Sequence, residues 1–519
     1  MFHRPISTAP ASPIESHEAG WLSRHWPEIA GAAAALVFVA FCLNIVPGPD
    51  VAWQLWTAHQ IRMGARLYVD IIETNPPLWF WEAVPLDWAS ALFRIPSHVL
   101  LVAATGCAAA LSVWGTGRLI KYIPAPWRAM LLVYAALTLL LMPLIDTGQR
   151  EQVVLIGMLP YAVLAAARRE GRAVAPLTAI AVAAGAALGF ALKHYFLAAP
   201  LLVELWLLAG QRRAYRPFRP ETITLVVLAI LYAALVVTIT PTFLTDMLTI
   251  NRLAYASVDH TALSDMFRPI QAYWLIALAP LVVEFGALRR SPLAAAMAVS
   301  TLGFGLAWLI QFRGFPYHSI PVSGCLMMTL ACFVVENRRT MRAATLVTAP
   351  TILLLPLCFT AWIGPFPDDF KPISRAMMKG VGPHESVAFV NYQAVFSWPL
   401  SLYRDAPYPS RQYGMWILGA VARDHGRTPA LTRLGQQVVE QTTQDYRCAQ
   451  PVRIIFSRLR AEGRDVKSWF NPSPAFVDLM SHYRHAGTYR HTDTDVIFDI
   501  YQLNAPFPKP PASTCRRSY

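Results

Sequence analysis

Long apolar runs alternate with short basic clusters along most of this chain. The first run covers about residues 29–46, roughly the length that an α-helix needs to cross a bilayer. Only 14% of the 519 residues are charged and 55% are hydrophobic, whereas a soluble chain of this size would need more charge on its surface. The pattern therefore predicts an all-α, polytopic membrane domain.

The basic clusters indicate the topology, because Lys and Arg hold loops on the cytoplasmic side of a membrane. They also account for the net charge of +13 without a nucleic-acid partner. If all the clusters are cytoplasmic, the apolar runs predict about eleven transmembrane helices, an inner N-terminal tail over 1–28 and an external C-terminus. The clusters are Arg118/Lys121/Arg128, Arg168/Arg169/Arg172, Arg212/Arg213/Arg216/Arg219, Arg289/Arg290 and Arg338/Arg339/Arg342.

One apolar segment, 77–93, does not fit as a span, because it would place every later basic cluster outside. It is short, and it carries Glu82, Pro85 and Asp87. Its large apolar side chains recur at helical spacing, which favours a helix lying on the outer membrane surface. We therefore expect an outer loop over 47–97 that contains a juxtamembrane helix.

The polar tail predicts a second domain. Hydropathy falls after Trp362, which divides the chain into a transmembrane domain, 29–362, and a small external α/β domain, 363–519. Cys448 and Cys515 are the only cysteines of the tail, and an oxidising compartment would let them pair. The expected elements are strands at 387–392, 452–456 and 495–503, helices at 428–444 and 475–484, and a loose, Pro-rich end at 504–519.

Chemistry is expected on the outer side, because the acidic and aromatic polar clusters fall in its loops. Asp50 follows the first apolar run and Pro47-Gly48-Pro49. Behind it the chain reads Gly64-Ala65-Arg66-Leu67-Tyr68-Val69-Asp70 and then Asn75-Pro76-Pro77-Leu78. An Asp here, followed by a "G…Y-x-D…PPL" stretch, resembles the GT-C glycosyltransferases of the protein O-mannosyltransferase and aminoarabinose lipid A transferase superfamily.

The resemblance implies the GT-C fold and the transfer of a sugar from a polyprenyl-phosphate donor. It is clear over about 30–170 and weaker beyond. In the aminoarabinose enzyme a Lys precedes the two prolines and binds the carrier phosphate, whereas this chain has Asn75. Another positively charged side chain must then bind the phosphate.

Transfer from such a donor needs a general base for the acceptor hydroxyl and positive charge for the departing phosphate. Asp50 is the candidate base, although an Asp at a helix end can be merely solvated. Two of the other charged residues have structural alternatives: Arg150 could pair locally with Glu151, and Lys193 could snorkel to the membrane surface. Acceptor or supporting candidates are Asp70, Glu73, Asp146, Glu151 and His318; phosphate-binding candidates are Lys193, Arg313, Arg150 and Tyr317.

No cofactor follows from the residues, but Asp50 and Asp146 are candidate ligands for a divalent cation, Mg²⁺ or Mn²⁺. The loop 241–269 is either a lid or a solvated connection. We interpret the chain as an inverting glycosyltransferase of the bacterial inner membrane, embedded in lipid, with a glycolipid, polysaccharide or protein acceptor on the periplasmic face. The alternatives are a transporter or flippase of lipid-linked sugars, or a non-catalytic scaffold on the same fold.

Overall fold

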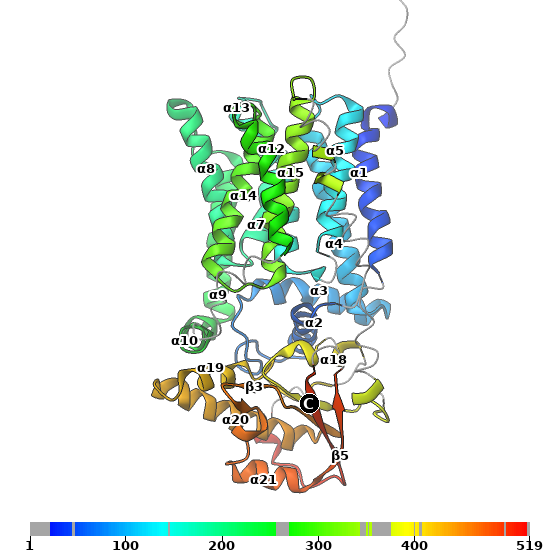
Figure 1. The fold of residues 1–519 in the computed structure, drawn as a ribbon, viewed down its shortest axis with the longest axis vertical. Coiled ribbons are helices and arrows are strands. Elements are labelled where there is room, and N and C mark those ends of the chain that lie inside the picture. Colours follow the sequence, from blue (N-terminus) through cyan, green and yellow to red (C-terminus); the bar gives the residue numbers. More distant parts are fainter. Residues whose placement is uncertain are drawn as a thin grey trace, which may run out of the picture.

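The computed structural model consists of a helical bundle with a smaller domain stacked on one end (Figure 1). The helical bundle and the C-terminal sheet lie toward opposite ends of the long axis (Figure 1). The structure describes residues 21–43, 47–143, 146–255, 269–342, 349–350, 352–354, 375–382, 384–398, 400–403, 407–491 and 495–515.

The bundle is built from helices that begin with proline and pack through small residues. Proline stands in the first turn of many of them, where its missing N–H is not needed. Gly157 and Gly189 bring α6 and α7 together, since a Cβ at either would lie under 3 Å from the facing backbone. The helices are α1 (Trp21–Cys42), α4 (Ser97–Leu119), α5 (Ala125–Leu141), α6 (Arg150–Arg169), α7 (Pro176–Phe190), α8 (Ala198–Gln211), α9 (Pro220–Ile239), α12 (Pro269–Val283), α13 (Phe285–Arg290), α14 (Pro292–Gln311) and α15 (Ile320–Asn337).

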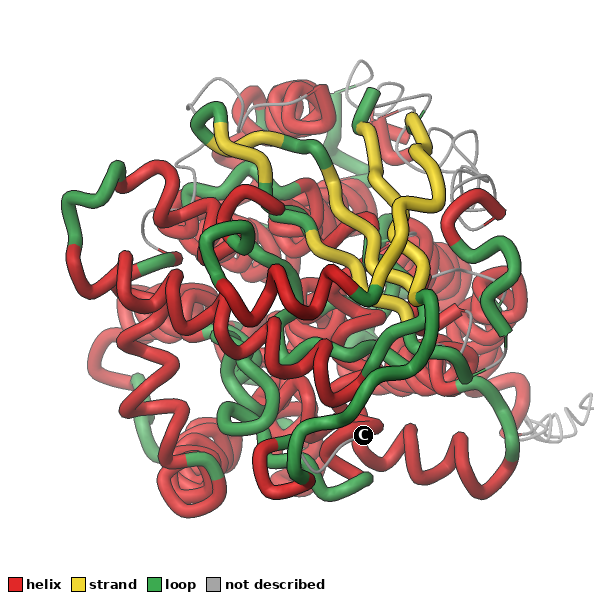
Figure 2. The backbone as a smooth tube through the Cα atoms, turned by 90° about the horizontal axis from the view of Figure 1, so that it is seen from below, coloured by secondary structure: helices red, strands yellow, loops and turns green. Residues whose placement is uncertain are grey.

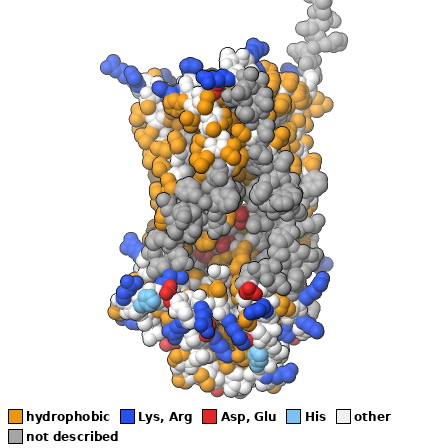
Figure 3. Space-filling view, viewed as in Figure 1, with side chains coloured by type: hydrophobic (Ala, Val, Ile, Leu, Met, Phe, Trp, Pro, Cys, Tyr) orange, Lys and Arg blue, Asp and Glu red, His pale blue; other side chains and the backbone are white. Residues whose placement is uncertain are grey.

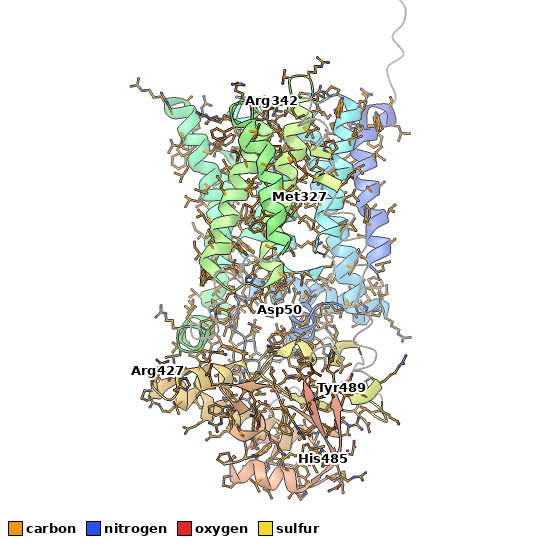
Figure 4. The ribbon with its side chains drawn as sticks, in the orientation of Figure 1. Asp50, Met327, Arg342, Arg427, His485 and Tyr489 are labelled. Carbon is orange, nitrogen blue, oxygen red and sulfur yellow. A yellow bond between two sulfur atoms is a disulfide. The ribbon has the colours of Figure 1, made fainter. Side chains whose placement is uncertain are left out.

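The basic clusters meet at the end of the bundle that is remote from the C-terminal domain. Arg172 donates to the carbonyl of Leu119 at 3.0 Å, and Arg168 pairs with Glu221 at 2.8 Å. Arg342 lies at this same end (Figure 4). Lys and Arg side chains line the rim there, and hydrophobic side chains cover the flank below it (Figure 3). This arrangement agrees with the sidedness inferred from the sequence.

Among the described residues, five helices are long and apolar enough to cross a membrane: 97–119, 150–169, 220–239, 292–311 and 316–337. Three shorter apolar helices, 125–141, 176–190 and 273–283, accompany them. The expected count of eleven and the orientation in the membrane stay predictions.

A labelling experiment tests that orientation. We expect a cysteine placed at Arg427 to react with a membrane-impermeant maleimide on intact spheroplasts, because Arg427 belongs to the C-terminal domain, which we expect to lie outside the cell membrane. A cysteine placed at Arg342 lies at the opposite end (Figure 4) and should react only after the membrane is opened. Reaction of both from the same side would contradict the assigned topology.

The outer loop lies between the bundle and the C-terminal domain (Figure 1). It contains α2 (Pro49–Arg62) and α3 (Leu78–Phe93). The two helices are joined by Asp87, which accepts hydrogen bonds from His59, at 3.3 Å, and from Arg62. Trp88 and Leu92 on α3 are 60% and 75% exposed, as expected for a helix with an apolar face on a membrane surface.

The C-terminal domain contains a four-stranded sheet of order β1-β2-β6-β5. The β1–β2 pair is parallel, and the other two pairs are antiparallel. One face packs against helices, and the other covers a small apolar core. Seen from below, the sheet and its helices lie across the end of the bundle (Figure 2). The elements are β1 (Val387–Val390), α18 (Leu400–Tyr403), α19 (Trp416–Asp424), α20 (Pro429–Ala449), β2 (Arg453–Ser457), β3 (Arg460–Ala461), β4 (Arg464–Asp465), α21 (Pro474–Ser481), β5 (Tyr483–Arg490) and β6 (Ile497–Leu503).

The sequence interpretation of this domain was close but incomplete. The strands expected at 387–392, 452–456 and 495–503 are present as β1, β2 and β6. The helix expected over 475–484 ends at Ser481, and Tyr483 already begins β5. The expectation missed β5 because its side chains are mostly exposed and polar, so it carries no apolar alternation. The boundary at 362/363 lies outside the described residues.

The end of the chain is held against α20, so the expected loose end at 504–519 is wrong for its described part, up to Cys515. A disulfide joins Cys448 and Cys515, as the sequence predicted. The His482 and Phe507 rings also stack, with centroids 4.3 Å apart. The sequence interpretation underestimated how strongly these contacts order a Pro-rich segment.

Candidate active site

Asp50 lies in the first turn of α2, at the junction of the bundle and the C-terminal domain (Figure 4). The preceding helix, α1, ends earlier, at Cys42, so Asp50 begins a helix rather than ending one. A helix N-terminus stabilises a carboxylate. The Asp50 side chain is 23% exposed, and it can therefore meet a substrate.

Arg150 begins α6 and faces Asp50. Its Nη2 lies 3.9 Å from Asp50 Oδ2, and its guanidinium lies over the Trp79 ring at 4.3 Å from the centroid. Arg150 Nη1 also donates to Asn75 Oδ1. Asn75, which replaces the Lys of the related motif, therefore orients a different cation toward Asp50. The alternative of a local pair between Arg150 and Glu151 does not describe the structure, in which Arg150 contacts Asn75 and Asp50 and Glu151 pairs with Lys193.

The Tyr-x-Asp part of the motif forms the turn that presents Asn75. Tyr68 has a positive φ of 71°, and its buried hydroxyl donates to the Asn75 carbonyl at 2.6 Å. Asp70 closes the turn by accepting from the Arg66 N–H at 2.8 Å. Glu73 is buried, which raises its pKa, and it accepts from Trp53 at 2.7 Å and from the Asn75 backbone and side chain. The Asp70 and Glu73 contacts described here are all to the protein, and their role toward an acceptor stays a prediction.

Lys193 and Glu151 form a buried ion pair beside Arg150. Lys193 Nζ lies 2.6 Å from Glu151 Oε1 and 3.2 Å from both Gln311 Oε1 and His318 Nε2. Glu151 is fully buried and Lys193 is 8% exposed, so the alternative that Lys193 snorkels to the interface is wrong. Burial lowers the pKa of Lys193 to about 8, against the opposing effect of the Glu151 carboxylate.

Asp146 lies in the loop before α6. Burial, and then the charges of Asp50 and Glu151, raise the pKa of Asp146 to about 8. Asp146 is therefore largely protonated at neutral pH unless a cation is near it. Within the described residues, no three His, Cys, Asp or Glu side chains converge as a metal-binding group.

Two further predicted residues lie around this cluster. The Tyr317 ring is 5.6 Å from Lys193 Nζ. Arg313 lies over the Tyr255 ring at 4.2 Å and donates to the Tyr255 carbonyl at 2.5 Å. Tyr255 follows α10 (Leu248–Leu253), which packs on the C-terminal domain. The rest of the proposed lid, 256–268, lies outside the described residues.

The C-terminal domain contributes a residue that sequence reasoning missed. The Tyr413 hydroxyl donates to Asp50 Oδ1 at 2.6 Å. Gln149 donates to the other oxygen, Oδ2, at 3.4 Å. Nothing in the sequence signals Tyr413, because 363 positions separate it from Asp50. Gln149 lies in the same stretch as Asp146, Arg150 and Glu151, and only the charged residues of that stretch were predicted to belong to the site.

Several buried polar atoms of this cluster have no hydrogen-bond partner among the described residues: Gln149 Oε1, Arg150 Nε and Glu151 Oε2. Buried polar atoms are rarely left without partners. Acidic side chains are also visible in a recess at the junction (Figure 3). The arrangement combines a partly exposed carboxylate with a buried guanidinium, and so can both accept a proton and hold an anion.

Comparison with known proteins places the fold. No family model and no curated protein sequence matches the chain. It aligns with the crystal structure of ArnT from Cupriavidus metallidurans bound to undecaprenyl phosphate, at 12% identity and a TM-score of 0.54, covering 95% of this chain and 100% of that one. Archaeoglobus fulgidus oligosaccharyltransferase, tethered with an acceptor peptide, aligns at 10% identity and a TM-score of 0.43 over 95% of this chain and 75% of that one. The match to ArnT, an aminoarabinose lipid A transferase, shows the GT-C fold.

Proposed function

We propose that this chain, which has the GT-C fold, is a membrane glycosyltransferase that moves a sugar from a polyprenyl-phosphate donor to an acceptor. The observation that carries the proposal is the facing pair of Asp50 and Arg150, 3.9 Å apart, at the end of the bundle that the C-terminal domain covers. A base and a cation side by side are what this transfer requires.

The acceptor is a hydroxyl compound, and Asp50 takes its proton as the oxygen attacks the anomeric carbon. The new O–C bond forms while the bond from that carbon to the phosphate oxygen breaks, which inverts the configuration. The polyprenyl phosphate leaves as an anion, so no general acid is needed. Arg150, which already lies beside the base, stabilises the charge that develops on the leaving phosphate.

The other cations have supporting roles in this proposal. Lys193 is held by Glu151, and that pairing limits the charge that it can offer to a phosphate. It still contributes one positive group near Arg150, together with the Tyr317 hydroxyl. Arg313 stands at the outer edge of the cluster, against Tyr255, where it can contact the donor on entry.

A divalent cation fits the donor set, because Mg²⁺ is usually held by one or two carboxylates together with substrate phosphates. Asp50 and Asp146 are the residues that would hold it; the pKa of Asp146 is raised first by burial and then by the charge of Asp50. When bound, Mg²⁺ or Mn²⁺ would supply further positive charge for the phosphate.

The membrane location is part of the proposal: the bacterial inner membrane, with the site and the C-terminal domain periplasmic. Transporters place ionisable groups near the bilayer midplane. Here the ionisable cluster lies at one end of the bundle, which favours an enzyme over a flippase. Comparing the glycolipids, polysaccharides and proteins of cells with and without the chain by mass spectrometry tests the proposal. Loss of one sugar from one acceptor supports it, and unchanged glycans contradict it.

Arg150→Gln tests the phosphate role. We expect purified Arg150→Gln to bind liposomes that carry undecaprenyl phosphate roughly 10- to 100-fold more weakly, because one charge-assisted contact is lost. Arg427→Gln, an exposed change in the C-terminal domain, is the matched control and should bind normally. Equal binding by both variants would transfer the role to Lys193 or Arg313.

A further inference from the structure

A short strap of the C-terminal domain, residues 408–413, carries Tyr413 to Asp50. The strap is tied at both sides. The Arg411 guanidinium pairs with Asp445 of α20 at 2.7 Å, and the Arg411 carbonyl accepts from the Ile72 N–H of the outer loop at 2.9 Å. The strap therefore links the sheet domain to the loop that follows α2.

Aromatic packing fixes the direction of the Tyr413 side chain. Its ring lies 5.3 Å from that of Trp53, and Trp398 donates to its carbonyl at 3.3 Å. Trp53, Trp398 and Tyr408 are among the largest fully buried side chains of the molecule. A ring held in such surroundings has one orientation, so its hydroxyl reaches Asp50 Oδ1 without further ordering.

We propose that Tyr413 is a positioning residue for Asp50, so that the C-terminal domain completes the catalytic centre. The inference rests on the proposed role of Asp50 as general base. With Oδ1 fixed by Tyr413, the carboxylate cannot turn about its Cβ–Cγ bond, and Oδ2 stays directed toward Gln149 and Arg150, where donor and acceptor meet. Oδ2 is then the oxygen that receives the acceptor's proton.

The test compares four purified proteins: wild type, Tyr413→Phe, Asp50→Asn and the double variant. The substrate is a polar lipid extract of cells that lack the chain, in which unused donor remains, together with the membrane fraction of the same cells as acceptor. The rate of polyprenyl-phosphate release is measured at several extract concentrations. We expect Tyr413→Phe to lower kcat roughly 10- to 100-fold with KM unchanged, and to cause no further loss when Asp50 is already Asn.

Tyr408→Phe is the control, because it removes a hydroxyl from the same aromatic cluster and should leave kcat near wild type. If Tyr413→Phe does not fold, Arg411→Gln loosens the strap from a distance, and its loss of kcat should likewise vanish in the Asp50→Asn background. Equal losses in both backgrounds, or a Tyr413→Phe variant as active as Tyr408→Phe, would overturn this inference alone. Full activity of Asp50→Asn would overturn the general-base assignment as well.

Discussion

Asp50→Asn is expected to lower the rate of sugar transfer by roughly 10² to 10⁴ while the protein still folds and binds its lipid donor. The substitution keeps the shape of the side chain and its hydrogen bond from Tyr413, and it removes the proton acceptor. If Asp50 only began α2, its loss would cost about 1 kcal/mol of stability and little rate. The rate of polyprenyl-phosphate release at equal amounts of folded protein distinguishes the two roles.

Asp478→Asn is a matched control for that experiment. It introduces the same Asp-to-Asn substitution on the surface of the C-terminal domain. There the Asp478 side chain is 56% exposed and pairs with Arg447 at 3.3 Å. Its activity should equal that of wild type. Near-normal transfer by Asp50→Asn would refute the base assignment and favour the transporter alternative.

Lys193→Met is expected to lower the free energy of unfolding by about 3–5 kcal/mol, because it leaves the fully buried Glu151 carboxylate without its partner. Replacing both residues, in Lys193→Met/Glu151→Leu, should recover most of that stability, since a buried pair can be exchanged for apolar side chains. Denaturation of the detergent-solubilised variants, followed by circular dichroism, measures the effect.

The exposed pair Arg490–Asp495 is the control for stability, and Asp495→Asn should cost less than about 1 kcal/mol. The rate of sugar transfer by the double variant distinguishes whether Lys193 contacts the donor phosphate or only stabilises the fold. If Lys193 contacts the donor phosphate, activity stays low although stability recovers. If activity recovers with stability, the pair is structural, and the phosphate is bound without Lys193.

The candidate site shows where local sequence was sufficient. Asp50 was predicted from its place after a long apolar run and from the resemblance of the stretch behind it to the GT-C motif, and the structure places it in the first turn of α2, beside Arg150. Its catalytic role stays a prediction. The Tyr68-Val69-Asp70 stretch was recognised as a motif, and it is one continuous turn held by its own hydrogen bonds. Features of this kind depend on neighbours in sequence, and a pattern can therefore reveal them.

Other site residues depended on contacts that no pattern reports. Lys193 was weighed as a snorkelling side chain, because its partner Glu151 stands 42 positions away. Arg150 was predicted as a phosphate-binding candidate, with local pairing to Glu151 as the alternative, and in the structure it contacts Asn75 and Asp50. The partner of a buried charged group depends on which residues the fold brings beside it, here Asp50 and Asn75 beside the first residue of α6.

By itself, the sequence determined that this chain forms a helical membrane protein, because hydropathy and charge can be read directly along a chain. That its chemistry lies at one face stays a prediction. It also suggested the cysteine pair, since Cys448 and Cys515 are the only thiols of the tail, and the structure contains that disulfide. Only the tertiary structure decided that the C-terminal domain shares the site. The Tyr413–Asp50 bond joins residues 363 positions apart, and such a contact exists only once two separately patterned domains have packed together.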